Sequence, residues 1–407
     1  MATTATFEYK VRDQRGALRK GRLDAESPAQ VAGKLKSMGY APVTITRAGS
    51  GLQREISLPG MTPKVRLKDL AVFARQFAVM ISSGLSLLRA LSILTQQTEN
   101  KELGRILGEV RNDIEIGNSL SESLLKHPRT FPPLMVNMIR AGEVGGFLEG
   151  VLLQLAENYE AEVRLRGKVK SAMTYPVVVF VIALLAVVGM LLFIVPVFVG
   201  MFEDLGGELP MPTKVLVLLS GATKVGAPLG LVAAVAFFFT WPKVKDSPRV
   251  RRVLDPLKLR MPVFGTLVRK IALSRFSRNL GTMLRSGVPI LQSLEIVAAT
   301  CGNVVLERAV DDVRESVRAG ESLAGPLVHH PVFPPMVVQM MSVGEDTGAL
   351  DTMLHKISDF YDQEVEATTE ALTSLIEPLM IAVLGAVIGA MIVALYMPIF
   401  GVFELIQ

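Results

Sequence analysis

Two carboxylates occupy matching places in the sequence and are the residues best suited to bind a cation. Glu143 follows Gly142, Glu345 follows Gly344, and a glycine-bearing turn comes after each pair. Carboxylate oxygens bind divalent cations, and a carboxylate beside a helix start can also accept hydrogen bonds from the free backbone N–H groups there. The sequence favours capping of the following helix, with a metal ion or a partner contact as the alternative.

A third carboxylate, Glu377, stands at the start of the last apolar run, immediately before Pro378. The matching place in the first apolar run holds Tyr175 and Pro176. If a helix begins here, the carboxylate gains about 0.3–1 kcal/mol from the positive end of the helix dipole. The alternative is an ion pair between Glu377 and a basic residue of a neighbouring span or subunit.

Common catalytic motifs are missing from the sequence. There is no Gly-x-x-x-x-Gly-Lys-Ser/Thr stretch, which excludes ATP hydrolysis by a P-loop mechanism, and no His-Glu-x-x-His or Gly-x-Ser-x-Gly. His127 and His330 each precede a proline and have no carboxylate placed in the sequence to orient them, which favours a structural role. The single cysteine, Cys301, lies at a predicted helix end and is interpreted as a buried thiol. We expect no enzymatic activity and no cofactor.

Three apolar runs are long enough to cross a membrane, which takes about 20 helical residues. The runs 171–202 and 378–403 contain no charged residue, and the run 215–241 contains only Lys224. The predicted spans are 171–202, 213–241 and 376–403.

Basic residues precede the first span and follow the second. The connection 203–212 between these spans is acidic and has no cation. Because cytoplasmic loops carry an excess of Lys and Arg, the N-terminus and the segment between the second and third spans are predicted to be cytoplasmic, and the tail 404–407 external. The bordering residues are Arg164, Arg166, Lys168, Lys170, Lys243, Lys245, Arg249, Arg251 and Arg252.

The chain contains an internal repeat. Residues 73–91 match 276–294, and the register continues, with one deletion, to the pair Tyr159 and Tyr361. The second span has no counterpart, and it supplies the return crossing that two units facing the same way require. The first and third spans align through Pro176 and Pro196 opposite Pro378 and Pro398, which lie near span boundaries and are interpreted as helix ends rather than kinks.

Helical patterns dominate each repeated unit. Apolar residues recur at three- and four-residue spacing, and Gly84, Gly117, the Phe131-Pro-Pro stretch and Gly142 are predicted to break the pattern into antiparallel helices. The fold is therefore predicted to be mainly α: an integral membrane protein with three transmembrane helices, two homologous cytoplasmic helical-bundle modules and a small N-terminal α/β unit, in which Ser27 caps the helix.

The predicted organisation follows from these boundaries. The α/β unit covers 1–47, a linker 48–63, the first module 64–170, the first span 171–202, a short external loop 203–212, the second span 213–241, a basic cytoplasmic connector 242–265, the second module 266–375, the third span 376–403 and the tail 404–407.

The residues around the spans resemble a known family. Lys168-Val-Lys-Ser-Ala-Met-Thr-Tyr-Pro lies at the start of the first span and Ile194-Val-Pro near its end. Together with the duplicated Gly-Glu-x-x-Gly, the three-span layout and Glu377-Pro378, these residues are similar to those of the type II secretion system F family (GspF/PilC), over essentially the whole chain.

The resemblance implies a function that composition does not give. Members of this family form a homo-oligomeric platform in the bacterial cytoplasmic (inner) membrane. They bind a separate hexameric ATPase and other inner-membrane assembly proteins, and they couple the ATPase to insertion of pilin or pseudopilin subunits into a growing fibre. The resemblance implies lipid contact and no nucleic-acid partner, and it leaves open a pilus, a secretion pseudopilus or a DNA-uptake filament.

Two other functional classes are disfavoured by the spans. A transporter places ionisable residues at mid-membrane, and the first and third spans have none. An intramembrane prepilin peptidase needs a pair of aspartates near membrane level, and no aspartate lies within the three spans.

Overall fold

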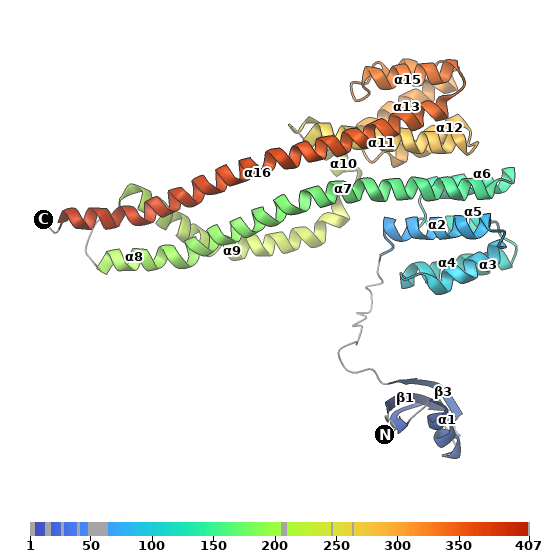
Figure 1. Cartoon of the computed structure of the whole chain (residues 1–407), viewed down its shortest axis with the longest axis horizontal. Coiled ribbons are helices and arrows are strands. Elements are labelled where there is room, and N and C mark those ends of the chain that lie inside the picture. The colour runs from blue at the N-terminus through green and yellow to red at the C-terminus, as the bar shows by residue number, and fades with distance from the viewer. Residues whose placement is uncertain are drawn as a thin grey trace. The chain divides into compact units, whose positions relative to one another are not determined.

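The computed structural model describes residues 5–12, 18–25, 28–38, 41–47, 64–204, 210–245, 247–262 and 264–405. The chain divides into two compact units, Met1–Pro63 and Lys64–Gln407 (Figure 1).

The N-terminal unit is a three-stranded antiparallel sheet with one helix. Strands β1 (Ala5–Arg12), β2 (Leu18–Ala25) and β3 (Ala41–Arg47) lie in the order β2-β1-β3. Helix α1 (Pro28–Ser37) packs against the sheet, and its Val31 and Leu35, one turn apart, are fully buried. The predicted cap Ser27 lies outside the described residues.

Module 1, the first helical bundle, consists of five short helices and the first part of a long one. The helices are α2 (Leu67–Ser82), α3 (Leu87–Gln97), α4 (Lys101–Glu115), α5 (Leu120–Leu125), α6 (Pro133–Gly145) and α7 (Leu148–Gly189). The chain turns at Gly84 and Gly117 as predicted, with φ of +81° and +101°, a backbone region that favours glycine. The predicted break at Gly142 is wrong, because Gly142 lies inside α6 and the turn comes at Gly146, with φ of +74°.

Module 2 repeats this arrangement. Its helices are α11 (Phe264–Arg285), α12 (Ile290–Thr300), α13 (Val304–Arg318), α14 (Ala324–Leu327), α15 (Pro335–Asp346) and the first part of α16 (Leu350–Leu405). An additional helix, α10 (Pro248–Arg260), precedes them. The buried Asp255 of α10 accepts a hydrogen bond from the backbone N–H of Val304 at 3.2 Å, which ties α10 to the start of α13.

Apolar side chains of both modules belong to one buried cluster. Phe73 of α2 lies 6.1 Å from Phe131, ring centre to ring centre, and the matching residues Phe276 and Phe333 lie 5.2 Å apart. The repeat therefore preserves an aromatic pair that packs the first helix of each module against the segment before its Pro-Pro turn.

Among the described residues, three helical stretches are long and apolar enough to cross a membrane, which confirms the predicted number. The first is α7, continued by the short π-helix η1 (Met190–Ile194) and by α8 (Val195–Asp204); the others are α9 (Met211–Val244) and α16. The predicted boundaries at 170 and 375 fall inside α7 and α16, so each module continues into its span as one helix (Figure 1).

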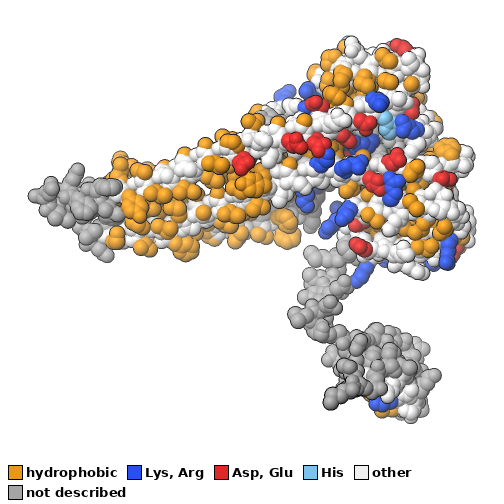
Figure 2. Space-filling view, viewed as in Figure 1, with side chains coloured by type: hydrophobic (Ala, Val, Ile, Leu, Met, Phe, Trp, Pro, Cys, Tyr) orange, Lys and Arg blue, Asp and Glu red, His pale blue; other side chains and the backbone are white. Residues whose placement is uncertain are grey.

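The spans contact one another over a small area. Thr213 of α9 donates a hydrogen bond to the carbonyl oxygen of Ala394, and Ser220 to that of Leu191, at 2.6 Å each. Only 11%, 11% and 17% of the most apolar windows of the three spans are buried within the chain. Figure 2 shows the resulting continuous apolar surface, which lipid or further subunits must cover.

Candidate functional site, the seam between the two modules

The two modules meet along a polar seam, formed by residues of α7 on one side and α11 on the other. Glu162 of α7 is its central residue, with only 12% of its side chain exposed. Its Oε1 lies 2.6 Å from Arg275 Nη2 of α11 and 2.6 Å from Arg166 Nε of its own helix. Arg278 Nη1 lies 4.0 Å from the other carboxylate oxygen. One buried carboxylate therefore faces three arginines.

Burial and charge act in opposite directions on this cluster. Burial lowers the pKa of Arg275, the Glu162 carboxylate opposes that shift, and the neighbouring Arg166 adds to it. A buried arginine is tolerated only where a carboxylate compensates its lost hydration. Glu162 therefore compensates the charge of Arg275 inside the seam and adds a weaker, 4.0 Å attraction for Arg278.

Arg278 also belongs to an ion pair that the repeat preserves. It contacts the Asp362 carboxylate of α16, and Ser274 Oγ donates to Asp362 Oδ1 at 2.5 Å. The matching pair in module 1 is Arg75 and Glu160, in which Nε and Nη2 donate to the two carboxylate oxygens at 2.7 Å each. Each pair fastens the first helix of a module to its last.

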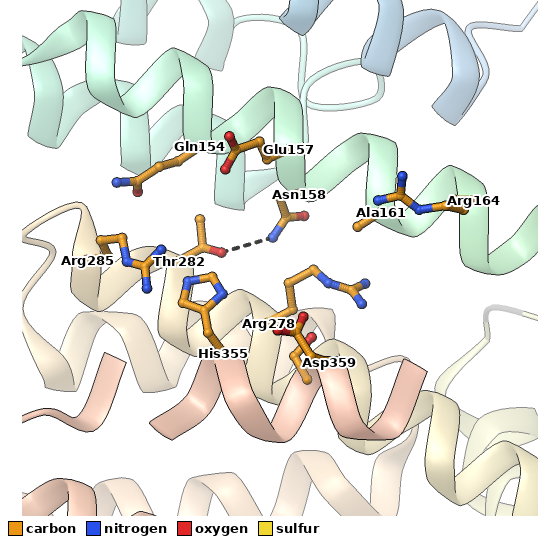
Figure 3. A pocket seen from close by; sticks show the side chains of 11 residues that line it. Gln154, Glu157, Asn158, Ala161, Arg164, Arg278, Thr282, Arg285, His355 and Asp359 are labelled. Atoms are coloured by element: carbon orange, nitrogen blue, oxygen red, sulfur yellow. Dashed lines mark hydrogen bonds between the residues drawn. The ribbon is translucent and has the colours of Figure 1, made fainter. Parts of the chain in front are cut away.

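Next to these ion pairs the seam contains a polar cleft of about 190 Å³. Figure 3 shows it lined by α7 from above and by α11 and α16 from below, with Asn158 of α7 reaching Thr282 of α11. Asn158 Nδ2 donates to Thr282 Oγ1 at 3.3 Å and to Asn279 Oδ1 at 3.2 Å. These bonds hold the two helices together across the cleft.

The cleft does not have the arrangement of a hydrolytic site. His355 and Ser358, one turn apart on α16, both line it, yet His355 Nε2 and Ser358 Oγ have no hydrogen-bond partner in the described chain. A nucleophile and its base lie within hydrogen-bond reach of each other. Burial, followed by repulsion from Arg285, lowers the pKa of His355, so this imidazole is neutral at pH 7.

Glu143 and Glu345 accept two backbone hydrogen bonds each. Glu143 Oε1 accepts from Leu120 N–H at 2.6 Å and its Oε2 from Ser121 N–H at 3.0 Å, at the start of α5. In module 2, Glu345 accepts from Leu323 N–H at 2.8 Å and Ala324 N–H at 3.2 Å, at the start of α14. The prediction that they cap the following helix is wrong, because each caps a short helix more than twenty residues earlier in the chain.

The alternative of a metal ion or partner contact at Glu143 and Glu345 stays a prediction. In the described parts of the chain no three His, Cys, Asp or Glu side chains gather closely enough to hold a metal ion. The neighbouring Gly142 and Gly344 have a packing role, since a Cβ on Gly142 would lie 3.0 Å from Val151 and one on Gly344 3.0 Å from Leu350. They allow α6 to approach α7, and α15 to approach α16, closely.

The proline interpretation is also wrong. Pro176 lies inside α7, Pro378 and Pro398 lie inside α16, and Pro196 is the second residue of α8. Pro196 lies two residues after the end of η1, whose wider π-helical turn accommodates a ring that would clash in a regular helix. In apolar surroundings, neighbouring helices can keep a helix continuous across a proline. The local sequence does not show whether such neighbours are present.

The structure brings Tyr175, Pro176 and Glu377 together. The three residues line one small apolar pocket of about 40 Å³ between α7 and α16. Glu377 is exposed and lies well inside α16, so the explanation from a helix N-terminus is wrong. In the described chain no ion pair of Glu377 is found, and its pairing with a neighbouring subunit stays a prediction.

Two other sequence interpretations have different outcomes. Cys301 is buried at the end of α12 as predicted, and burial raises the pKa of its thiol to about 12. The histidines do have carboxylates beside them: His127 Nε2 lies 3.6 Å from Glu109, and His330 Nε2 lies 3.2 Å from Asp312, at matching places in the two modules. Helix packing supplies these carboxylates from elsewhere in the chain.

Comparison with known proteins gives consistent matches over nearly the whole chain. The family model described as type II secretion system (T2SS), protein F, matches residues 73–196 and again 276–398. The model described as type II secretion system protein F, N-terminal domain, matches residues 1–46. The two matches of the first model coincide with the two repeated units.

Relatives from several bacteria carry related names. The type IV pilus assembly protein PilC of Thermus thermophilus is 46% identical over 88% of this chain and 89% of its own length. PilC of Myxococcus xanthus is 43% identical over 99% and 96%, and the type II secretion system protein F of Xanthomonas campestris is 34% identical over 88% and 89%.

We expect Glu143→Gln to lower the free energy of unfolding by about 1–3 kcal/mol. The amide NH₂ group would face backbone N–H groups that now donate to a carboxylate. Chemical unfolding of the detergent-solubilised chain measures the loss. Glu149→Gln, at an exposed site on the first turn of α7, is the matched control and should change little. A chelator that destabilises the unmodified chain but not Glu143→Gln would show instead that the residue binds a metal.

We expect Glu162→Gln to destabilise the seam by about 3–5 kcal/mol, because it removes the carboxylate that pairs with Arg275 and leaves Arg278 with Asp362 alone. Hydrogen exchange should rise in the facing parts of α7 and α11 before it rises elsewhere. Glu157→Gln removes the same charge from an exposed residue of α7 and serves as the control. Equal effects of the two substitutions would contradict a special role for Glu162.

Proposed function

Because the chain belongs to the type II secretion system protein F family, we propose that it is the membrane platform of a fibre-assembling machine, which couples a separate hexameric ATPase to the insertion of pilin subunits. The observation that carries the proposal is the duplicated module: two matches to the family model, each a helical bundle that continues into a membrane-spanning helix. In such a layout the modules provide a docking surface for the ATPase, and the membrane-spanning helices anchor them.

A type IV pilus is the fibre we favour. Two relatives named type IV pilus assembly protein reach 46% and 43% identity and others 36% and 33%, against 31–36% for three type II secretion system F proteins. The pilins and the other inner-membrane assembly proteins are the partners that follow from this assignment.

We further propose that the N-terminus and both modules face the cytoplasm and that the C-terminus is external. The support is the distribution of charge, with basic residues before the first span and after the second and an acidic connection between them. Cytoplasmic modules would be within reach of a cytoplasmic ATPase.

The chain itself is proposed to perform no catalysis. Its polar cleft contains no paired nucleophile and base among the described residues, and the sequence contains no P-loop motif. The work of assembly must then come from a partner that hydrolyses nucleotide. The mostly unburied apolar faces of the spans fit a homo-oligomer in the membrane.

The proposal is tested on the full chain. Deletion of its gene should abolish surface fibres, and the tagged chain, cross-linked in its own membrane, should co-purify with a hexameric ATPase. The purified chain alone should hydrolyse no ATP above a matched membrane-protein control. Intact fibres and secretion after deletion, or ATP hydrolysis by the chain alone, would refute the platform function.

Glu377 is proposed to pair with a basic group of a neighbouring subunit. We expect Glu377→Gln to weaken the detergent-solubilised oligomer at least about tenfold, as the loss of a charged hydrogen bond does. Glu370→Gln, two helical turns earlier on the same face of α16, is the control. If sedimentation shows the same dissociation for both variants and the unmodified chain, Glu377 makes no such contact.

A further inference from the structure

A second cavity, outside the seam cleft, lies where α7 leaves module 1 for the membrane. Its volume is about 330 Å³. Four apolar side chains and three cationic ones line it, five on α7 and two on α11, and one of the two on α11 is Arg275 of the seam. They are Leu165, Val169, Met173, Ile271, Arg166, Lys170 and Arg275.

Positive charge exceeds negative charge around this cavity. Arg166 and Arg275 both pair with Glu162, and Lys170 has no ion pair in the described chain. Three cations therefore face a single carboxylate. Arg275 Nε is in addition a buried donor without a hydrogen-bond partner in the described chain. An anion here would gain charge complementarity and a free donor at the same time.

The cavity lies at the level along α7 where lipid headgroups are expected. Lys170 is the last charged residue before the uncharged run 171–202, and Met173 lies within that run. Figure 2 shows Lys and Arg side chains, with Asp and Glu side chains among them, where the apolar part of the molecule meets the modules. Basic pockets at this level, on the module side of the membrane, suit phosphate headgroups.

We propose that this cavity binds one anionic phospholipid, with its phosphate among Arg166, Lys170 and Arg275 and an acyl chain along Leu165, Val169 and Met173. The apolar wall distinguishes a lipid from a soluble anion, which would gain nothing from it. The excess of cations distinguishes an anionic lipid from a zwitterionic one. Because the lipid would touch both α7 and α11, it would join module 1 to module 2 at the membrane surface.

The test uses the full chain, purified in detergent and exposed to an equimolar mixture of phosphatidylglycerol and phosphatidylcholine. Native mass spectrometry should detect one retained phosphatidylglycerol per chain. Lys170→Gln should weaken its binding about fivefold, the effect of one cation near an anionic headgroup. Lys170 is exposed, so the substitution leaves the fold intact.

Lys168→Gln is the matched control. Lys168 lies two residues before Lys170 and carries the same charge, but it pairs with Glu366 and does not line the cavity. The substitution should leave phosphatidylglycerol binding unchanged. Equal retention of the two lipids, or equal effects of the two substitutions, would overturn the proposal. Displacement of the lipid by millimolar glycerol phosphate would also overturn it, since the site would then be one for a soluble anion.

Discussion

The arrangement of the two modules depends on one carboxylate that several arginines share. Glu162 lies inside the contact between α7 and α11, where three guanidinium groups approach it and only 12% of its own side chain is exposed. Without it the arginines would repel one another in a medium that screens charge poorly. This charge balance allows the arginines to lie beside the apolar cluster that spans both modules.

The same repeat yields two different environments. The ion pair of Arg75 with Glu160 is partly exposed, with 34% and 38% of the side chains accessible, whereas its counterpart Arg278 is 7% exposed. The difference arises because α7 of module 1 packs on the α11 face that carries Arg278, while Arg75 and Glu160 on the matching face of module 1 stay one-third exposed among the described residues. Two copies of one bundle thus acquire distinct surfaces simply by docking on each other.

Local sequence predicted the number of spans, the repeat and most turns, since these depend on composition and on residues near in the chain. Gly84 and Gly117 end helices because of their own backbone freedom. Gly142 and the four prolines were misinterpreted, because their helices continue or end according to packing against distant segments.

The residues of the seam could not be predicted from local sequence for the same reason. Glu162 and Arg275 are far apart in the chain and meet only through the docking of the modules. One signal was present in the sequence: Arg75 and Arg278 occupy the same place in the repeated stretch, and a charged residue kept among the apolar positions inside a helix suggests a fixed partner. The carboxylates that cap α5 and α14 likewise reach back over a distance that no local pattern encodes.

The unbroken passage of α7 and α16 from bundle to membrane has a mechanical consequence. At about 1.5 Å per residue, the 42 residues of α7 extend roughly 60 Å and the 56 of α16 roughly 80 Å. A tilt of about 5° at the bundle end of such a rod displaces its far tip by roughly 5 Å or more, a distance comparable to one helical turn. Small rotations of the modules are in this way amplified into movements of several ångström, roughly one helical turn, at the far ends of these helices, with no hinge loop between to absorb them.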